Sequence, residues 1–117
     1  MGITYINGTV TGPNGQRTVQ FLVDSGAVYS LLPFEIWQGI GLKPKRSMSF
    51  RLADGTQIER QVSECHFTLD AGDGYSPVIL GEPGDDAALL GVVTLEVIGL
   101  VFNPFSRTLH PMRLLLA

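Results

Sequence analysis

Short apolar runs separated by glycine and proline dominate this chain. Residues 3–11 and 18–23 are rich in β-forming side chains, and residues 12–15 between them, Gly-Pro-Asn-Gly, contain an Asn-Gly pair that strongly favours a hairpin turn. Both runs are therefore predicted to be strands of one hairpin. Another short strand is predicted at residues 30–32.

The clearest alternation of apolar and polar residues begins at residue 47. Residues 53–56, Ala-Asp-Gly-Thr, interrupt it and are typical of a hairpin tip. In the returning strand the apolar phase changes between Val62 and Cys65, so a bulge or bend is expected at residues 63–64. Because its far half is polar, this long hairpin is predicted to project beyond the core.

The remaining segments predict short elements. Pro33 suits the first turn of a helix at residues 34–38. Residues 77–80 are a core strand, and residues 100–102 and 108–110 form a last pair of strands. A second helix is predicted at residues 92–98, with Val92, Leu95 and Ile98 on one stripe and Gly99 at its end. The fold class predicted is all-β or mostly β, with one or two short helices.

The composition fits one domain spanning residues 1–117. With 44% hydrophobic and 16% charged residues the chain is able to bury a real core, and 14 glycines and 7 prolines indicate many turns. The single cysteine excludes an internal disulfide.

The charge pattern excludes some partners. The net charge is −3 and the basic residues are spread out, so neither a nucleic acid nor an anionic membrane surface is expected as a partner. No run reaches transmembrane length, and the start lacks the pattern of a signal peptide. A cytoplasmic location is the expectation.

One stretch carries candidate chemistry: three apolar residues at positions 21–23 lead directly into Asp24-Ser25-Gly26-Ala27. A carboxylate at the end of a buried strand is costly unless it is hydrogen-bonded or neutral. An ordinary Asp-Ser-Gly turn is the plain alternative. Context must decide between them.

Three segments in order supply that context: residues 22–27 (Leu-Val-Asp-Ser-Gly-Ala), residues 53–56, and residues 88–91 (Ala-Leu-Leu-Gly). From about residue 19 to residue 109 the chain resembles the retropepsin-like aspartic proteases. The resemblance implies a closed β-barrel with a flap hairpin. It also implies a homodimer that pairs Asp24 of both protomers, a peptide or protein substrate, and neither a cofactor nor a metal.

The resemblance also assigns roles to other residues. Ser25 would hydrogen-bond across the dimer, and Gly26 and Ala27 would support the catalytic loop. The flap would be formed by Ala53, Asp54, Gly55 and Thr56, and the substrate pocket would be lined by Ala87 and Leu89.

Two positions depart from the viral members of this family. An acid two residues after the motif's glycine pairs there with an arginine just after the second glycine run, whereas this chain has Val28 and Val92. Since both charges are absent together, an apolar contact rather than a stranded ion is expected. The chain is thus similar to the cellular or bacterial type.

Two other functions stay open. A catalytically silent relative would keep the fold as a dimerisation or peptide-binding module. A hydrolase with two carboxylates, such as a glycosidase, would need a second acid on a core strand, which the sequence does not offer.

Other acids and the cysteine are given structural interpretations. Glu82, Asp85 and Asp86 are predicted to form a solvated loop rather than a metal site. Cys65 and His66 are neighbours on a strand and face opposite ways, so Cys65 is predicted to be a buried structural thiol.

Overall fold

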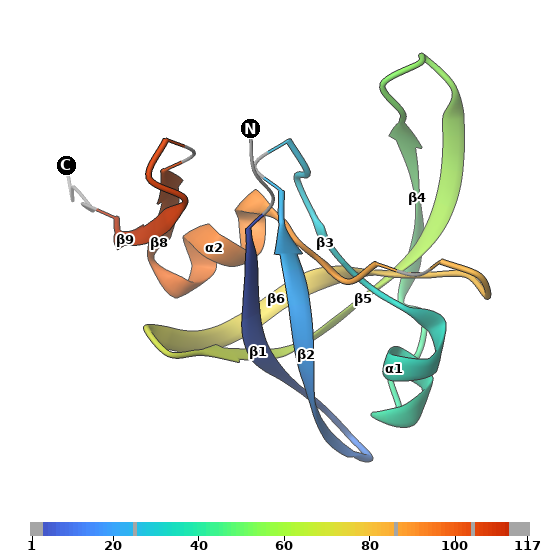
Figure 1. Cartoon of the computed structure of the whole chain (residues 1–117). Helices are drawn as coiled ribbons and strands as arrows, with labels where there is room; N and C mark the ends of the chain where they lie inside the picture. Colours follow the sequence, from blue (N-terminus) through green and yellow to red (C-terminus); the bar gives the residue numbers. More distant parts are fainter. Residues whose placement is uncertain (1–3, 25, 86, 104, 113–117) are drawn as a thin grey trace, which may run out of the picture.

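Strands make up most of the described chain, which comprises residues 4–24, 26–85, 87–103 and 105–112 of this computed structural model (Figure 1). The prediction of a mostly-β chain with two short helices is confirmed. In chain order the elements are β1 (Tyr5–Gly12), β2 (Gly15–Val23), β3 (Ser30–Leu32), α1 (Phe34–Gly39), β4 (Arg46–Arg51), β5 (Gln57–Leu69), β6 (Gly72–Leu80), β7 (Leu89–Leu90), α2 (Val92–Ile98), β8 (Leu100–Asn103) and β9 (Thr108–Pro111).

The main sheet closes on itself. Its strand order is β1-β2-β7-β3-β6-β5-β4, and an additional antiparallel pairing of β1 with β5 joins the two sides into a ring. Strand β4 pairs with β5 alone among the described strands and so hangs on the outside of the ring. The closed barrel predicted for this chain is therefore present, and closure leaves few open strand edges.

The core is built from the inward-facing residues of the barrel strands. Phe21 of β2 and Phe67 of β5 are fully buried and their ring centroids lie 5.9 Å apart. Cys65 lies in the same cluster, as predicted for a structural thiol. Burying apolar area of this kind stabilises the fold by roughly 25 cal/mol per Å². Strand β2 is thereby fixed in the core up to Val23, and Asp24 follows at once.

Strand β5 changes its buried face without a bulge. The β4–β5 register is regular from Arg46↔Val62 to Arg51↔Gln57, and the β5–β6 register is regular from Val62↔Ile79 onward. Of the bulge or bend expected at residues 63–64, the bulge is therefore absent. The buried face changes where β5 leaves β4 and joins β6 and β1, so that Val62 and Ser63 are buried in succession. A long strand that pairs with β4 in its first half and with β6 and β1 in its second half does not bury the same face along its whole length.

Helix α2 turns the predicted stripe inward and buries one more residue beside it. Leu95 is buried, Val92 and Ile98 are half-buried with Ile98 packed against the core, and Glu96 is exposed, as predicted. Thr94 is also fully buried, which the apolar spacing did not predict. Gly99 ends the helix in a left-handed conformation with φ 88°, as expected for a glycine C-cap.

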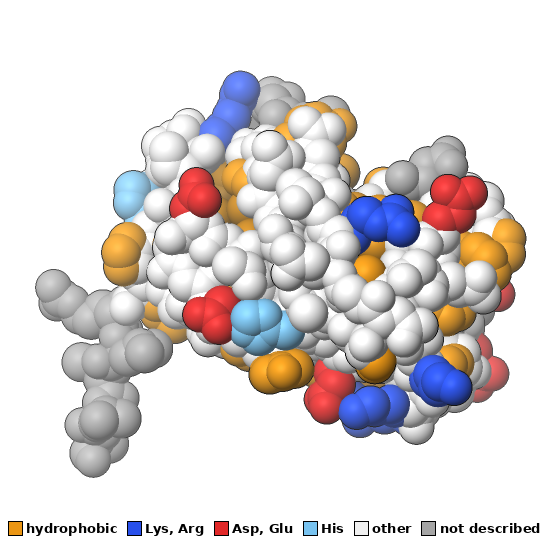
Figure 2. All heavy atoms as spheres, turned by 90° about the horizontal axis from the view of Figure 1, so that it is seen from below, with side chains coloured by type: hydrophobic (Ala, Val, Ile, Leu, Met, Phe, Trp, Pro, Cys, Tyr) orange, Lys and Arg blue, Asp and Glu red, His pale blue; other side chains and the backbone are white. Residues whose placement is uncertain are grey.

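The surface carries no large charged patch on the face shown in Figure 2, where acidic and basic side chains are interspersed. Within the described ranges, no helix is long and apolar enough to span a membrane. In that same part of the chain, no three His, Cys, Asp or Glu side chains are grouped to hold a metal ion.

Cys65 gives a test of the core. Burial raises the pKa of its thiol to about 12, from an ordinary value of 9.0. At pH 8 the native thiolate is therefore roughly a thousandfold scarcer than in the unfolded chain. We expect a thiol reagent such as Ellman's reagent to label the native protein very slowly and the urea-unfolded protein at once. Equal labelling rates in the two states would contradict the buried placement.

Candidate active site

Asp24 begins a tight turn directly after β2. The N–H of Gly26 donates to Asp24 Oδ1 at 2.9 Å, and the N–H of Ala27 donates to the Asp24 main-chain carbonyl at 3.1 Å. Asp24 itself is half-buried and Gly26 is exposed. Ser25 lies outside the described residues. The carboxylate is thus fixed by the main chain of its own loop and remains accessible, as a reactive group must be.

Residues 90–93 hold this loop from behind. The Leu90 carbonyl accepts the N–H of Asp24 at 3.3 Å. The first N–H groups of α2, those of Val92 and Val93, donate to the carbonyls of Ala27 and Val28, each at 2.9 Å. These donors have no partner inside a helix, so the loop satisfies them. Two of the three predicted segments are therefore brought together by main-chain hydrogen bonds.

Strand β7 explains why the two segments meet. Leu89 pairs with Leu22 of β2 in parallel register and with Leu31 of β3 in antiparallel register, so this short strand lies between them. Leu89 is half-buried beside the loop and Ala87 is exposed; their place in a substrate pocket stays a prediction.

Gly91 is the point of closest approach. A Cβ atom at this position would lie 2.5 Å from the carbonyl carbon of Tyr29 and 2.8 Å from the carbonyl oxygen of Val28. Atoms do not approach so closely without a shift of the main chain. The glycine is therefore required by space.

The predicted flap segment is the tip of the β4–β5 hairpin, which projects from the barrel (Figure 1). Ala53, Asp54, Gly55 and Thr56 are all exposed. Gly55 has φ 89°, a conformation that favours glycine. The N–H of Thr56 donates to Asp54 Oδ1 at 2.9 Å, and this hydrogen bond holds the pKa of the Asp54 carboxyl below its ordinary value. Asp54 thus shapes the turn.

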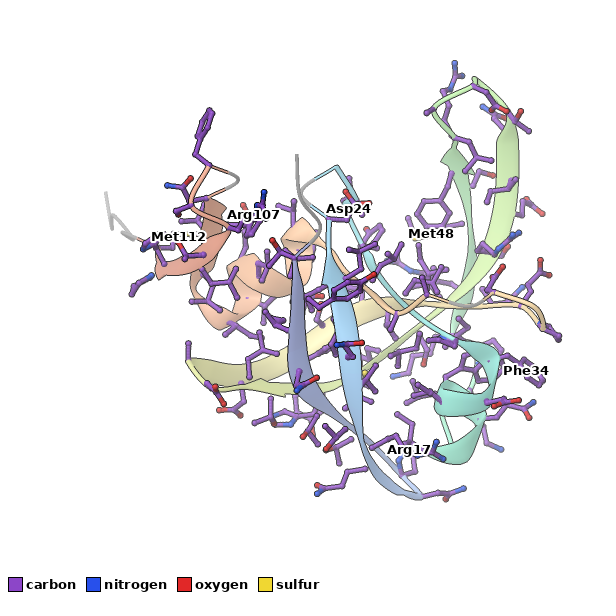
Figure 3. The ribbon with its side chains drawn as sticks, viewed as in Figure 1. Arg17, Asp24, Phe34, Met48, Arg107 and Met112 are labelled. Carbon is purple, nitrogen blue, oxygen red and sulfur yellow. The ribbon has the colours of Figure 1, made fainter. Side chains whose placement is uncertain are left out.

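An aromatic contact links the hairpin to the loop that follows Asp24. The rings of Tyr29 and Phe50 meet edge to face with centroids 5.9 Å apart. In Figure 3 the Asp24 side chain lies at the end of the molecule toward which the hairpin projects, and Met48 of β4 lies on the hairpin side. Sequence reasoning missed this pair, and an alternating strand gives no signal of its partner.

The two departures from the viral pattern differ in exposure. Val28 is 60% exposed and Val92 is half-buried, so their side chains do not form a buried apolar pair within one chain. An exposed valine beside Asp24 lowers the polarity of the surface there.

Other candidate groups lie away from Asp24. His66 Nε2 lies 2.7 Å from Asp73 Oδ2 on the β5–β6 hairpin. Asp85 Oδ2 accepts the N–H of Glu82 within a turn at 2.9 Å, and Asp86 lies outside the described residues. A cavity of about 870 Å³ lies between α1 and the β1–β2 turn, and none of the predicted site residues line it.

These observations define the class. A closed barrel, an acid-glycine loop at the end of a buried strand, a glycine run that locks the loop and a projecting hairpin together are the features of a retropepsin-like aspartic protease fold. The chain belongs to the aspartyl protease family, whose model matches residues 6–92. The solution structure of the simian foamy virus (mac) protease has the same fold, with a TM-score of 0.57 and 17% identity over 80% of this chain and 92% of that chain. No curated protein matches the sequence.

The close approach at Gly91 predicts the effect of a methyl group. Gly91→Ala is expected to destabilise the protein by about 3 kcal/mol, because the main chain at Tyr29 must move. Gly72→Ala is the matched control, since its new Cβ would make only an ordinary contact with Ile98 at 3.4 Å and should change stability by less than about 1 kcal/mol. Urea denaturation measures both, and equal stabilities would contradict the packing described.

Proposed function

We propose that this chain is an aspartic endopeptidase whose active site forms when two copies bring their Asp24 carboxyls together. The observation that carries the proposal is the geometry at Asp24, which follows a core strand, is held by the N–H of Gly26 and keeps an accessible side chain. The family match over residues 6–92 supports it, because that range contains both the Asp24 loop and the Gly91 run.

The chemistry requires two carboxyl groups in different protonation states. The ionised group takes a proton from a water molecule, whose oxygen attacks the carbonyl carbon of the peptide. The protonated group donates to the carbonyl oxygen, and a proton then passes to the departing amine. Two carboxyls about 3 Å apart share one proton, as is general for aspartic proteases. Each chain has one Asp-Ser-Gly motif, so the second Asp24 is supplied by a partner.

Exposed apolar residues support self-association on this face. The start of β1, the β2–β3 loop and the β8–β9 turn lie at the same end of the molecule in Figure 1. These segments carry Tyr5, Val28 and Phe105, which are 53%, 60% and 96% exposed. Exposed apolar side chains at one end of a molecule are typical of a surface that another protein covers.

The substrate class follows from the hairpin. The outer edge of β4 has no strand partner in the described chain, so an extended peptide is able to add main-chain hydrogen bonds there. Met48 and Phe50 of the hairpin strand β4 are half-buried and favour apolar substrate side chains. The tip at residues 53–56 would close over the peptide and exclude water.

Replacement of the carboxyl tests the reaction. Asp24→Asn is expected to reduce cleavage of a peptide library at mildly acidic pH by roughly a thousandfold or more, since it removes the acid-base group while keeping the shape. Asp70→Asn, in the exposed β5–β6 turn, is the matched control and should cleave like the unmodified protein.

The same digest distinguishes the alternative. If the unmodified protein and Asp24→Asn both fail to cleave, and both bind the same peptides equally, the chain is a peptide-binding module. Cleavage that survives Asp24→Asn would remove this residue from the mechanism.

Mixing chains tests the shared site. When unmodified protein is mixed with about a tenfold excess of the Asp24→Asn chain and allowed to exchange subunits, most unmodified chains pair with a mutant. Activity per unmodified chain should then fall to about one-tenth. An equal excess of Asp24→Asn added without time for exchange controls for substrate competition. Undiminished activity after exchange would show that one chain suffices.

A further inference from the structure

Three hydroxyl groups are buried in a row behind the Asp24 loop. Ser30 of β3, Thr94 of α2 and Ser76 of β6 are 0%, 0% and 1% exposed. Thr94 Oγ1 lies 2.5 Å from Ser30 Oγ and 2.8 Å from Ser76 Oγ. We call Ser30, Thr94 and Ser76 the hydroxyl chain. It joins three elements that are far apart in the sequence.

Counting protons gives the hydroxyl chain a single direction. At one end the N–H of Gly91 donates to Ser30 Oγ at 3.0 Å, and at the other end the Ser76 hydroxyl donates to the Pro77 carbonyl at 3.2 Å. Because a carbonyl has no proton to give, Ser76 uses its only proton there. Thr94 must then donate to Ser76, and Ser30 must donate to Thr94. Each hydroxyl accepts once and donates once, and Thr94 is the link between the two serines.

The hydroxyl chain reaches Asp24 through one peptide group. The N–H that donates to Ser30 Oγ and the carbonyl that accepts the N–H of Asp24 belong to the same peptide bond, between Leu90 and Gly91. A peptide bond is planar, so fixing its N–H fixes the direction of its carbonyl. The next two N–H groups, at Val92 and Val93, hold the far side of the loop.

Packing alone does not require hydroxyl groups at these positions. A valine has nearly the shape of threonine, and apolar residues at all three sites would avoid the cost of burying polar atoms. What the hydroxyls add is direction, because a hydrogen bond restricts an angle whereas apolar contact does not.

We propose that Thr94 is a positioning residue for Asp24: through Ser30 it fixes the Leu90–Gly91 peptide plane, and that plane sets the main chain from which the Asp24 carboxyl projects. The proposal rests on the proposed function for its catalytic consequence. In a reaction whose two carboxyls must meet at close range, a small displacement of the loop lowers turnover more than it weakens substrate binding.

Two substitutions at the same position separate the hydroxyl from the packing. Thr94→Val keeps the shape and breaks the hydroxyl chain, whereas Thr94→Ser keeps the hydroxyl and loses a methyl group. With the best-cleaved peptide of the library, Thr94→Val should lower kcat by roughly 10- to 100-fold with KM changed by less than about threefold. Thr94→Ser should stay within about threefold of the unmodified kcat. Because breaking buried hydrogen bonds also destabilises the fold, kcat is compared under conditions in which both variants are fully folded. A kcat of Thr94→Val within about threefold of the unmodified value, or a loss in Thr94→Ser as large as in Thr94→Val, would overturn the proposal.

Amide hydrogen exchange tests the positioning without any catalysis. In Thr94→Val the N–H groups of Gly91 and Asp24 should exchange at least about tenfold faster than in Thr94→Ser, while the barrel amides of Val10 and Phe67 keep their rates. Ser30→Ala, which removes the hydroxyl that accepts the Gly91 N–H, replaces Thr94→Val if that variant does not fold, and should show the same selective loss. If the unmodified protein does not cleave, the proposed function fails and the exchange rates alone decide the positioning. Unchanged rates at Gly91 and Asp24 would overturn it.

Discussion

The insertion of β7 between β2 and β3 is the constraint on which the rest of this protein depends. Its two residues, Leu89 and Leu90, close that side of the barrel because β7 pairs with both neighbours, in parallel with β2 and antiparallel with β3. The main chain that leaves β7 must then run directly beneath the Asp24 loop. Glycine at position 91 allows this close approach, and the carbonyl of Leu90 and the first N–H groups of α2 become the supports of the loop. The same segment, β7 and the residues after it, therefore closes the barrel and supports the Asp24 loop.

Much of this arrangement is predictable from the sequence, since local patterns report local structure. The Asn-Gly turn, the alternation around Phe50 and the glycine after residue 98 each predict an element that the structure contains. Local patterns do not show which segments, distant in the sequence, contact one another in the fold. Strand β5 serves two layers, and its change of face gave a false signal of a bulge between Val62 and Cys65. The contact of Tyr29 with Phe50 likewise depends on two loops that meet only in the folded chain.

The buried hydroxyls were missed for a related reason. Thr94 lies one position before Leu95 on α2, and an apolar stripe drawn through Val92, Leu95 and Ile98 passes it by. A stripe that includes Gly91, Thr94, Leu95 and Ile98 has equally good helical spacing, with i, i+3 and i+4 steps. Leu95 and Ile98 belong to both stripes, and burial adds Gly91 and Thr94 to them. A polar residue such as Thr94, three positions after a close-packed glycine, thus indicates a buried face of the helix. A pattern that counts only apolar residues does not detect it.

The hydroxyl chain behind Asp24 and the apolar surface near it affect the same loop in different ways. Val28 is exposed and lacks the charge of the viral pattern, so its side chain gives the loop no directional contact within the chain. Apolar contact with a partner would favour association without fixing an angle, whereas the proposed sharing of a proton between two Asp24 carboxyls would need a defined angle. In this protein the angle is supplied from inside, through the Leu90–Gly91 peptide. Because Val28 and Val92 replace the ion pair of the viral members, the orientation of Asp24 in this chain depends more on buried hydrogen bonds.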